Sequence, residues 1–270
     1  FIENDDVKSF NIEVNNAFDD LDKIFDDLKV ILVRMKKILP SLNVPKHLII
    51  VNSFQTYSVA TLGDTIIVGL DMYLGENSIY YNDPEYLNFR KSHRFLVADI
   101  LENWLTNLLP KDQEGSFINE LIYRGKIMYL LHKIMIGYSP QDIMRFDKEK
   151  LDWCYRNQKN IWMEIQRLGL SNSIPDRSFF YPARSTYRMT EDSPGRLGYW
   201  VGYRVVDEYM KKTKSSLTEL IINKNPSFIL EKSEYNPQNR SDKNENKDKR
   251  SVFQRYWWAL LILLILLLYL

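Results

Sequence analysis

Cysteine and histidine are scarce in this 270-residue chain, and their scarcity excludes several classes of protein. The single cysteine, Cys154, has no partner for an intramolecular disulfide, and three histidines without further cysteines exclude zinc fingers and zinc ribbons. The fold must therefore be held together by side-chain packing. Hydrophobic residues make up 45% of the chain, which is enough for one large core or two small ones.

Neither sign of charge is in clear excess. Lys and Arg total 36 while Asp and Glu total 35, so the formal net charge is +1. A protein that holds the phosphate backbone of a nucleic acid needs a positive field, and this composition does not supply one. We therefore expect no nucleic-acid partner.

The common signatures of catalysis and of nucleotide binding are also missing. The sequence contains no H-E-x-x-H zinc motif, no G-x-S-x-G nucleophile elbow, no G-x-G-x-x-G and no Walker A motif. Cys154 lies between two aromatic residues in a predicted helix, so we expect it to pack in the core and not to react. From these motifs we predict no cofactor, no metal and no catalytic residue.

An uninterrupted apolar segment, WWALLILLILLLYL, occupies Trp257–Leu270. It holds no charge, glycine or proline, which is typical of a membrane segment, although a full span also needs the residues back to Val252. Aromatic residues at both of its ends suit the interfacial belts of a bilayer. These residues are Tyr256, Trp257, Trp258 and Tyr269. We predict that residues 252–270 form a membrane helix that anchors the chain.

A polar stretch precedes this segment. Residues 233–251 are rich in Asn, Lys, Asp and Arg and poor in apolar residues, which predicts a solvated linker. Residues 1–232 then form the folded domain. The Lys and Arg near the anchor favour a cytoplasmic position for that domain by the positive-inside rule.

The N-terminal part of the domain combines one helix with short strands. Between residues 16 and 39 apolar residues recur at steps of three and four, which predicts an amphipathic helix. Three runs rich in β-branched residues follow, at His47–Val51, Thr56–Thr61 and Thr65–Leu70. We predict that they form a small antiparallel sheet whose second and third strands make a hairpin.

Helical periodicity takes over from Ser92 and continues to about Lys212. Two of the predicted helices begin with a serine N-cap followed by proline, and these serines are Ser139 and Ser193. Others are predicted at Phe117–Met135 and Lys148–Leu168. The predicted fold class is therefore α+β, mainly helical, with a small antiparallel sheet near the N-terminus and a C-terminal membrane helix.

The helix predicted after Ser193 has one side almost without side chains. Gly195, Gly198 and Gly202 fall at i, i+3 and i+7, and each costs up to about 1 kcal/mol of helix stability relative to alanine. Two interpretations of these glycines remain open. Either the helix packs closely in the core, or its backbone approaches a bound peptide or ligand.

Two aromatic loops are a further feature of the domain. Tyrosines cluster around Gly75, and a second group of aromatic residues occupies positions 172–192. They comprise Tyr73, Tyr80, Tyr81, Tyr86, Phe179, Phe180, Tyr181 and Tyr187. Such residues suit protein partners, and they equally suit anchoring of the loops in a core.

Six segments occur in an order that is specific as a series. They are TIIVGLDMYLGENSIYY at residues 65–81, PEYLNFR at 84–90, ELIYRGKIMYLL at 120–131, YSPQDIMRFDKEKLDWCYRNQKNIW at 138–162, SPGRLGYWVGYRVVDEYM at 193–210 and SEYNP at 233–237. In this order they resemble the gliding motility lipoprotein GldB family of Bacteroidetes, a degenerate relative of predicted zinc proteases of the zincin type. The resemblance implies a zincin-like α+β domain.

The resemblance also implies that the zinc ligands of the protease relatives are absent. Where those relatives carry a His-Glu pair on the helix after the sheet, this chain reads FLVADILENW, and where they carry Glu-Gly it reads Arg124-Gly125. Because an arginine does not lose its proton to bind zinc, the fold is expected to persist as a non-catalytic module. The old cleft would still grip a peptide. The residues predicted to border it are Arg124, Gly125, Ser193, Gly195, Arg196, Gly198, Trp200 and Gly202.

From the resemblance we predict a non-catalytic, membrane-tethered cell-envelope protein that supports gliding motility and the associated secretion machinery through protein partners. The family implies an N-terminal lipid and a periplasmic position. Where this conflicts with the cytoplasmic position that the positive-inside rule favours, we predict the periplasmic one. The alternative is a divergent zinc-dependent metalloprotease with ligands such as His93, Glu102 and Glu120. A further alternative is a carbohydrate or peptidoglycan binder that uses the two aromatic loops.

Overall fold

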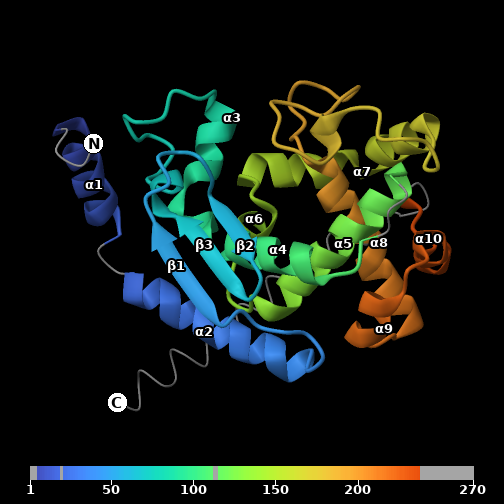
Figure 1. The fold of residues 1–270 in the computed structure, drawn as a ribbon. Coiled ribbons are helices and arrows are strands. Elements are labelled where there is room, and N and C mark those ends of the chain that lie inside the picture. The colour runs from blue at the N-terminus through green and yellow to red at the C-terminus, as the bar shows by residue number, and fades with distance from the viewer. Residues whose placement is uncertain (1–4, 19–20, 112–114, 238–270) are drawn as a thin grey trace, which may run out of the picture. The chain divides into compact units, whose positions relative to one another are not determined.

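The computed structural model of this chain describes residues 5–18, 21–111 and 115–237. By its internal contacts the chain divides into two units, Phe1–Tyr235 and Asn236–Leu270, and the first unit holds the described helices and strands (Figure 1). The α-helices are α1 (Asp5–Ala17), α2 (Leu21–Ile38), α3 (Glu85–Asn88), α4 (Leu96–Leu108), α5 (Phe117–Ile134), α6 (Pro140–Met144), α7 (Lys148–Leu168), α8 (Leu197–Thr213), α9 (Leu217–Ile222) and α10 (Pro226–Ser233). The strands are β1 (His47–Val51), β2 (Val59–Leu62) and β3 (Thr65–Gly69). Short 3₁₀ turns are η1 (Leu70–Met72), η2 (Phe89–Lys91), η3 (His93–Phe95) and η4 (Arg177–Phe179).

Strand β3 is the centre of the sheet, whose order is β1-β3-β2. Its inward residues Ile66 and Val68 are each 1% exposed. Strand β2 pairs antiparallel with β3, from Val59 opposite Val68 to Leu62 opposite Thr65. The predicted hairpin is therefore confirmed.

The sheet is mixed, so the prediction of a wholly antiparallel sheet is wrong. Strand β1 pairs in parallel with β3, from His47 opposite Thr65 to Val51 opposite Gly69. After β1 the chain forms β2 and turns back, so that β3 inserts between the two earlier strands. The physical reason is burial, because β3 is the most apolar of the three strands and the central position removes it from both edges.

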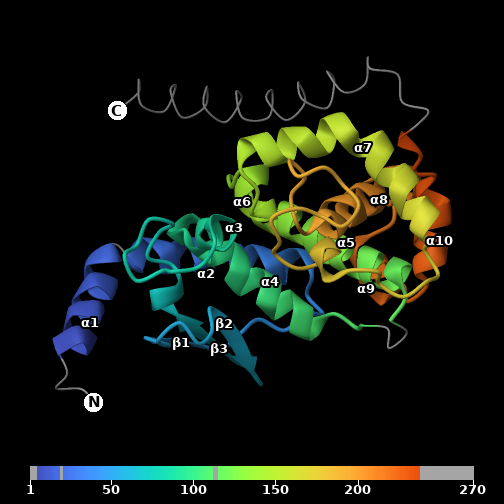
Figure 2. The same ribbon diagram turned by 90° about the horizontal axis from the view of Figure 1, so that it is seen from above.

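Helices α2 and α4 lie on the same side of the sheet (Figure 2). Helix α4 contacts β2 and β3 and buries its apolar face there. The indole of Trp104 donates a hydrogen bond to the carbonyl oxygen of Asn43 at 2.9 Å, which ties α4 to the segment before β1. The remaining face of α4, which carries Asp99 and Glu102, is thereby turned toward the helical half of the domain.

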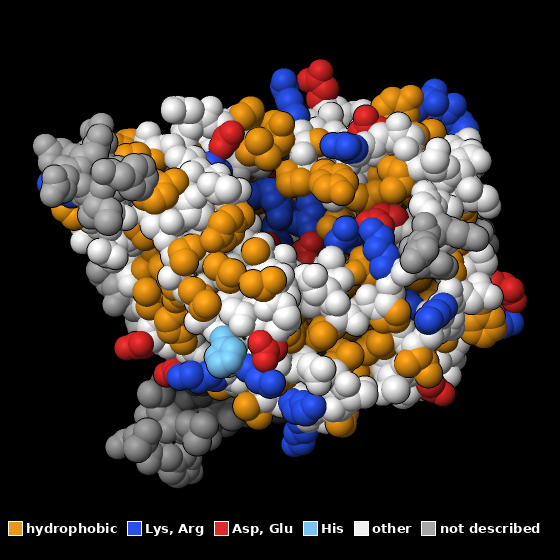
Figure 3. Space-filling view, in the orientation of Figure 1, with side chains coloured by type: hydrophobic (Ala, Val, Ile, Leu, Met, Phe, Trp, Pro, Cys, Tyr) orange, Lys and Arg blue, Asp and Glu red, His pale blue; other side chains and the backbone are white. Residues whose placement is uncertain are grey.

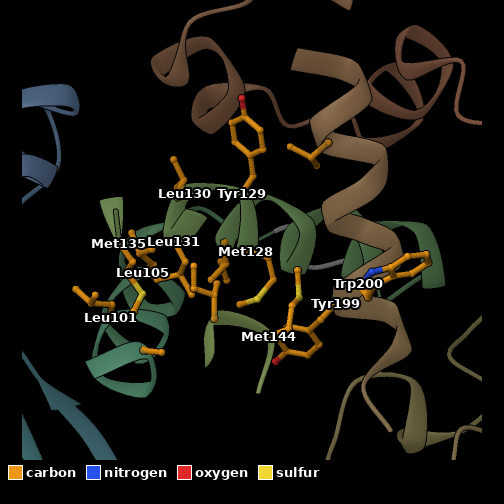
Figure 4. Packing of buried hydrophobic residues seen from close by; sticks show 14 of the residues in the cluster. Leu101, Leu105, Met128, Tyr129, Leu130, Leu131, Met135, Met144, Tyr199 and Trp200 are labelled. Atoms are coloured by element: carbon orange, nitrogen blue, oxygen red, sulfur yellow. The ribbon is translucent and has the colours of Figure 1, made fainter. Parts of the chain in front are cut away.

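Helices α5 and α8 make the most extensive helix contact among the described elements. They cross at Gly125 and Gly202, where a Cβ atom added to Gly202 would collide with the carbonyl oxygen of Leu121. Side chains of α4, α5, α6 and α8 meet around this crossing in one core, as Figure 4 shows. They include Leu101, Leu105, Met128, Leu131, Met144, Tyr199 and Trp200.

Helix α8 does not begin as the Ser193–Pro194 pattern predicts. It begins at Leu197, and its N-cap residue Arg196 has a left-handed backbone with φ of 62° and no side-chain cap. The Oγ of Ser193 instead accepts a hydrogen bond from the backbone N–H of Thr186 at 3.0 Å. Ser193 therefore stabilises the preceding loop and does not cap helix α8.

The prediction of a C-terminal membrane helix as part of the fold class needs correction. Among the described residues no helix is both long enough and apolar enough to cross a bilayer. Even α5, which is buried along most of its length, carries charged residues such as Glu120, Arg124 and Lys126. Residues 252–270, with the predicted anchor residues Tyr256, Trp257, Trp258 and Tyr269, lie outside the described residues.

The first residues of the predicted linker are packed against the domain. Ser233 is fully buried, and the ring of Tyr235 meets that of Trp162 edge-on with centroids 5.1 Å apart. These contacts follow from α10, which carries the chain back against the core before Tyr235. Residues 238–251 of the predicted linker lie outside the described residues.

The partly buried His132 makes the stability of the domain depend on pH. The ring of His132 stacks on that of Tyr203 with centroids 4.3 Å apart, and burial lowers its pKa to about 4. Between pH about 6.5 and about 4 the His132 imidazole is therefore protonated in the unfolded chain and neutral in the folded one. Because the ring is partly exposed, we expect about 1–3 kcal/mol of unfolding free energy to be lost as the pH falls through this window.

The measurement is urea unfolding at a series of pH values. The His132→Phe variant keeps a ring on Tyr203 and should lose most of the slope in this window, while the exposed His47→Gln serves as the matched control with an unchanged slope. An equal slope in His132→Phe and in the parent chain would contradict the assignment.

Candidate functional site

A cavity of about 600 Å³ opens where the loops after β1 and β3 approach α4 and α5. Figure 3 shows a hollow near the middle of one face of the domain, with Lys and Arg side chains at its depth. The charged residues that line this cavity, called the charged pocket below, are Asp83, Arg90, Lys91, Asp99, Glu102 and Arg124. Apolar side chains complete the wall. They belong to Val59, Met72, Leu87 and Pro182.

Two carboxylates of α4 form one side of the pocket. Asp99 and Glu102 stand three residues apart, so they lie on the same face of the helix. The buried guanidinium of Arg145 joins them, since its Nε lies 2.8 Å from Asp99 Oδ1 and its Nη2 lies 2.9 Å from Glu102 Oε2. Arg196 adds a second cation, whose Nη2 lies 3.0 Å from each oxygen of Glu102. Both carboxylates are therefore held in place by arginine.

The two arginines that hold Glu102 have left-handed backbones. Arg145 ends α6 with φ of 56°, and Arg196 precedes α8 with φ of 62°. Residues other than glycine seldom adopt this conformation, which costs of order 1–3 kcal/mol and persists only where the surroundings enforce it. The ion pairs with Glu102 supply such enforcement, because both guanidinium groups are buried.

The charges around Glu102 decide its protonation. Burial raises the pKa of this carboxyl, but the arginines around it, Arg196 and Arg145 foremost, outweigh burial and hold the pKa well below its usual range. Glu102 is therefore ionised at neutral pH. A carboxylate that is ionised and shared between two guanidinium groups is a poor general acid or base, because its proton affinity is too low and its lone pairs are occupied.

Two more cations of the pocket have their own acidic partners. Lys91 Nζ lies 2.5 Å from Asp83 Oδ2 and 3.9 Å from the ring centroid of Tyr81. Arg124 Nε lies 2.7 Å from Glu120 Oε1 one helical turn away. These pairs are close enough to neutralise both cations.

Arg90 differs from the other cations of the pocket. The acidic oxygen that it approaches is Asp99 Oδ1, at 3.9 Å from its Nη2, and Asp99 is already engaged by Arg145 and by the hydroxyl of Tyr73. Burial together with the positive charge of Arg196 lowers the pKa of Arg90 to about 10. Arg90 is thus the least neutralised cation among the described residues of the pocket.

A strained loop forms the rim beside β1. Phe54 and Gln55 are consecutive residues with φ of 51° and 58°. The buried carboxylate of Asp71 holds this turn, since it accepts hydrogen bonds from the backbone N–H groups of Ser53 at 2.6 Å and Gln55 at 2.5 Å. The loop keeps its unfavourable backbone through these bonds and thereby places Gln55 at the pocket.

The predicted cleft residues fall into two groups in the structure. Arg124 lines the charged pocket, and Arg196 reaches the same cluster through Glu102. Ser193 and Trp200 are buried at 0% and 1% exposure, and the indole of Trp200 packs edge-on against Tyr155.

The predicted glycines lie in close packing positions. A Cβ atom on Gly125 would collide with the backbone of Gly202, one on Gly198 with the ring of Phe180, and one on Gly195 would lie 2.5 Å from the backbone nitrogen of Ala183. Protein atoms therefore occupy the space beside each glycine, as the packing interpretation expects. Peptide binding at these positions stays a prediction.

Four of the eight aromatic loop residues are buried, and Tyr80 and Tyr86 are half-buried. Tyr73 donates a hydrogen bond to Asp99, and Tyr81 donates one to the carbonyl oxygen of Asp71 at 2.6 Å. Phe179 and Phe180 pack on Phe117, whereas Tyr181 and Tyr187 remain exposed. The loops are thus anchored by their aromatic residues, which leaves little aromatic surface for a sugar.

The ligand set of the metalloprotease alternative is not assembled. Among the described residues no group of three or more His, Cys, Asp or Glu side chains could hold a metal ion. His93 is exposed, Glu102 is held by two arginines, and Glu120 is held by Arg124 and Lys111.

Sequence reasoning missed Arg90, Asp99 and Arg145 as members of a site. One signal could have found part of it, because Asp99 and Glu102 interrupt an otherwise apolar run and a buried acid calls for a cation. Nothing in the local sequence around Arg145 indicates that it supplies this cation, since the contact spans 46 residues to Asp99.

Comparison with known proteins adds one match. A family model described as gliding motility protein GldB matches residues 1–237. No curated protein and no solved structure matches the chain.

Proposed function

This chain belongs to the GldB family of gliding motility proteins, and from that premise we propose that it acts in gliding as a non-catalytic binding or assembly module whose charged pocket receives a partner. Membership of the family implies the role in gliding. The name of the family model also marks a lipoprotein, which is consistent with attachment to a membrane of the cell envelope. We place the domain on the periplasmic side and its partners in an envelope complex that includes the secretion machinery.

The commitment of the pocket carboxylates to arginines carries the non-catalytic part of the proposal. Hydrolysis by a zincin-type site needs neutral histidines and a carboxylate that is free to take a proton from water. Glu102 is instead fixed as an anion between Arg145 and Arg196. Descent from a zinc protease is part of this proposal and rests on the resemblance alone, which implies a metal ligand at the position that Arg124 occupies.

Zinc content tests this proposal. We expect the full chain, purified without chelator and analysed by elemental mass spectrometry, to contain less than about 0.1 zinc per chain. A value near one zinc per chain, retained on dialysis and lost in His93→Gln, would contradict the non-catalytic module. His93 is the matched position because it is the histidine of the alternative ligand set.

Gliding provides the second readout. Cells that carry His93→Gln as their only copy should glide at the parent speed, because the exposed imidazole makes no contribution to the charged pocket. Loss of gliding at unchanged protein abundance would revive the metalloprotease alternative.

A further inference from the structure

We propose that the charged pocket binds a single carboxylate group of a polypeptide partner, from an acidic side chain or a chain terminus, and that Arg90 receives it. The proposal rests on the binding-module function and names the chemistry of its ligand. It is carried by the charge balance of the pocket, by the position of Arg90 and by the mixed polar and apolar wall.

The charge balance leaves one cation over. Around the pocket the described residues provide five cations and four carboxylates: Arg90, Lys91, Arg124, Arg145 and Arg196 against Asp83, Asp99, Glu102 and Glu120. Arg145, Arg196 and Glu120 do not line the cavity but pair, buried, with residues that do. Lys111 also pairs with Glu120, but its side chain is 55% exposed, so solvent screens its charge. A buried cation without a full counter-charge is unfavourable, so one added negative charge is stabilised there.

The distances identify Arg90 as the surplus cation. Each of the other four cations has a carboxylate oxygen within 3.0 Å, whereas the ion pair of Arg90 with Asp99 spans 3.9 Å. The side chain of Arg90 is 20% exposed and lines the cavity, so a ligand can reach it. Its planar guanidinium offers two parallel N–H donors, the geometry that matches a carboxylate.

The acidic side of the pocket limits the charge of the ligand. Asp99 and Glu102 line the same cavity as Arg90. A phosphate that carries close to two negative charges would bring its second charge near these carboxylates, while the other cations named here among the described residues already have carboxylate partners. The pocket therefore favours a monoanion, and a carboxylate is the monoanion that polypeptides supply.

The wall of the pocket is apolar enough to pack against the methylene groups that carry the carboxylate of the ligand. Val59, Met72, Leu87 and Pro182 present apolar surface in the same cavity as Arg90, where the methylene groups of an acidic residue can pack. A cavity of about 600 Å³ lies within the range of roughly 300–1,000 Å³ that is usual for ligand sites. This volume is large enough for an acidic side chain of a partner.

Methionine NMR of the full chain tests the proposal, because Met72 lines the pocket and Met35 is buried elsewhere. With methyl-¹³C methionine, sodium butyrate should shift the Met72 resonance saturably and leave that of Met35 unchanged. Butyramide, its neutral analogue, should cause no saturable shift, and inorganic phosphate should bind at least tenfold more weakly than butyrate. An absent shift with butyrate, or an equal shift with butyramide, would overturn the carboxylate site.

Arg90→Gln should raise the Kd for butyrate at least tenfold. The matched control is Arg184→Gln, because Arg184 also makes an ion pair at 3.9 Å but stands exposed on the surface. An unchanged Met35 resonance without ligand shows that both variants are folded, because Met35 is buried away from the pocket. An equal Kd in Arg90→Gln and Arg184→Gln would overturn the role of Arg90.

Two peptides then distinguish the sources of the carboxylate. Acetyl-Ala-Glu-Ala-amide presents it only on a side chain, and acetyl-Ala-Ala-Ala with a free C-terminus presents it only on the terminus. Binding of either supports the polypeptide source, and binding of neither while butyrate binds overturns it. Failure here is distinct from failure of the proposed function, because a zinc content near one per chain would refute the binding module whatever Met72 reports.

Discussion

Replacing Glu102 by glutamine is expected to lower the free energy of unfolding by about 3–5 kcal/mol, because it leaves the buried guanidinium of Arg196 without its carboxylate and leaves Arg145 with Asp99 alone. Arg145 and Arg196 both reach Glu102 at 2.9–3.0 Å, and both side chains are almost fully buried. Their left-handed backbones add to the effect, since the ion pairs help to hold them. Urea unfolding of the full chain at pH 7 measures it.

The matched control for this change is Glu231→Gln. Glu231 pairs with Lys232 at 3.0 Å, but both side chains are largely exposed, so its loss should change stability by no more than about 0.5 kcal/mol. Equal midpoints for Glu102→Gln and Glu231→Gln would show that the buried ion pairs do not hold the domain together.

Gly202→Ala is expected to cost about 3 kcal/mol, in spite of the higher helix propensity of alanine. The new methyl group would collide with the carbonyl oxygen of Leu121 and lie 3.0 Å from the Cα of Gly125, and backbone atoms cannot move aside without separating α5 from α8. The expected result is a lower urea midpoint with an unchanged slope. Because the crossing lies next to the core that supports Tyr199 and Arg124, partial loss of gliding should accompany it.

Gly115→Ala provides the comparison for the glycine prediction. No atom lies within 4 Å of a Cβ built at Gly115, so this variant should differ from the parent by less than about 0.5 kcal/mol. A tolerated Gly202→Ala would mean that the two helices have room to separate, and the glycines would then need the ligand interpretation.

Local signals in the sequence located most elements. Apolar periodicity located α7 at Lys148–Leu168, and the Ser139–Pro140 pair marked α6, where the serine side chain accepts a hydrogen bond from the N–H of Asp142. Both signals lie within one or two helical turns of sequence, and the contacts that fix a helix and its N-terminus are equally local.

Features that depend on distant contacts were not predictable in the same way. The parallel pairing of β1 with β3 depends on which strand takes the centre, and each short run is compatible with either direction. Ser193 resembles an N-cap in sequence, yet its hydroxyl is already bonded to Thr186 of the preceding loop.

The candidate site shows the same limit. Arg124 was expected at a cleft because of its place in the family series, and the structure puts it at the charged pocket. The pocket also needs Arg145, whose contact to Asp99 spans 46 residues, and Arg90, whose weak pairing is visible only as a distance. Charge balance within a cavity is a property of the fold and cannot be read from one segment.

The gliding speed of cells that carry Arg90→Glu as their only copy tests the central claim most directly, with Arg184→Glu as the control at equal protein abundance. Arg90→Glu turns the surplus positive charge of the pocket into a negative one, whereas Arg184→Glu makes the same change on the exposed surface. The binding-module function predicts that Arg90→Glu abolishes gliding or slows it at least tenfold while Arg184→Glu glides at the parent speed. Equal speeds for the two variants, with both proteins folded, would contradict it.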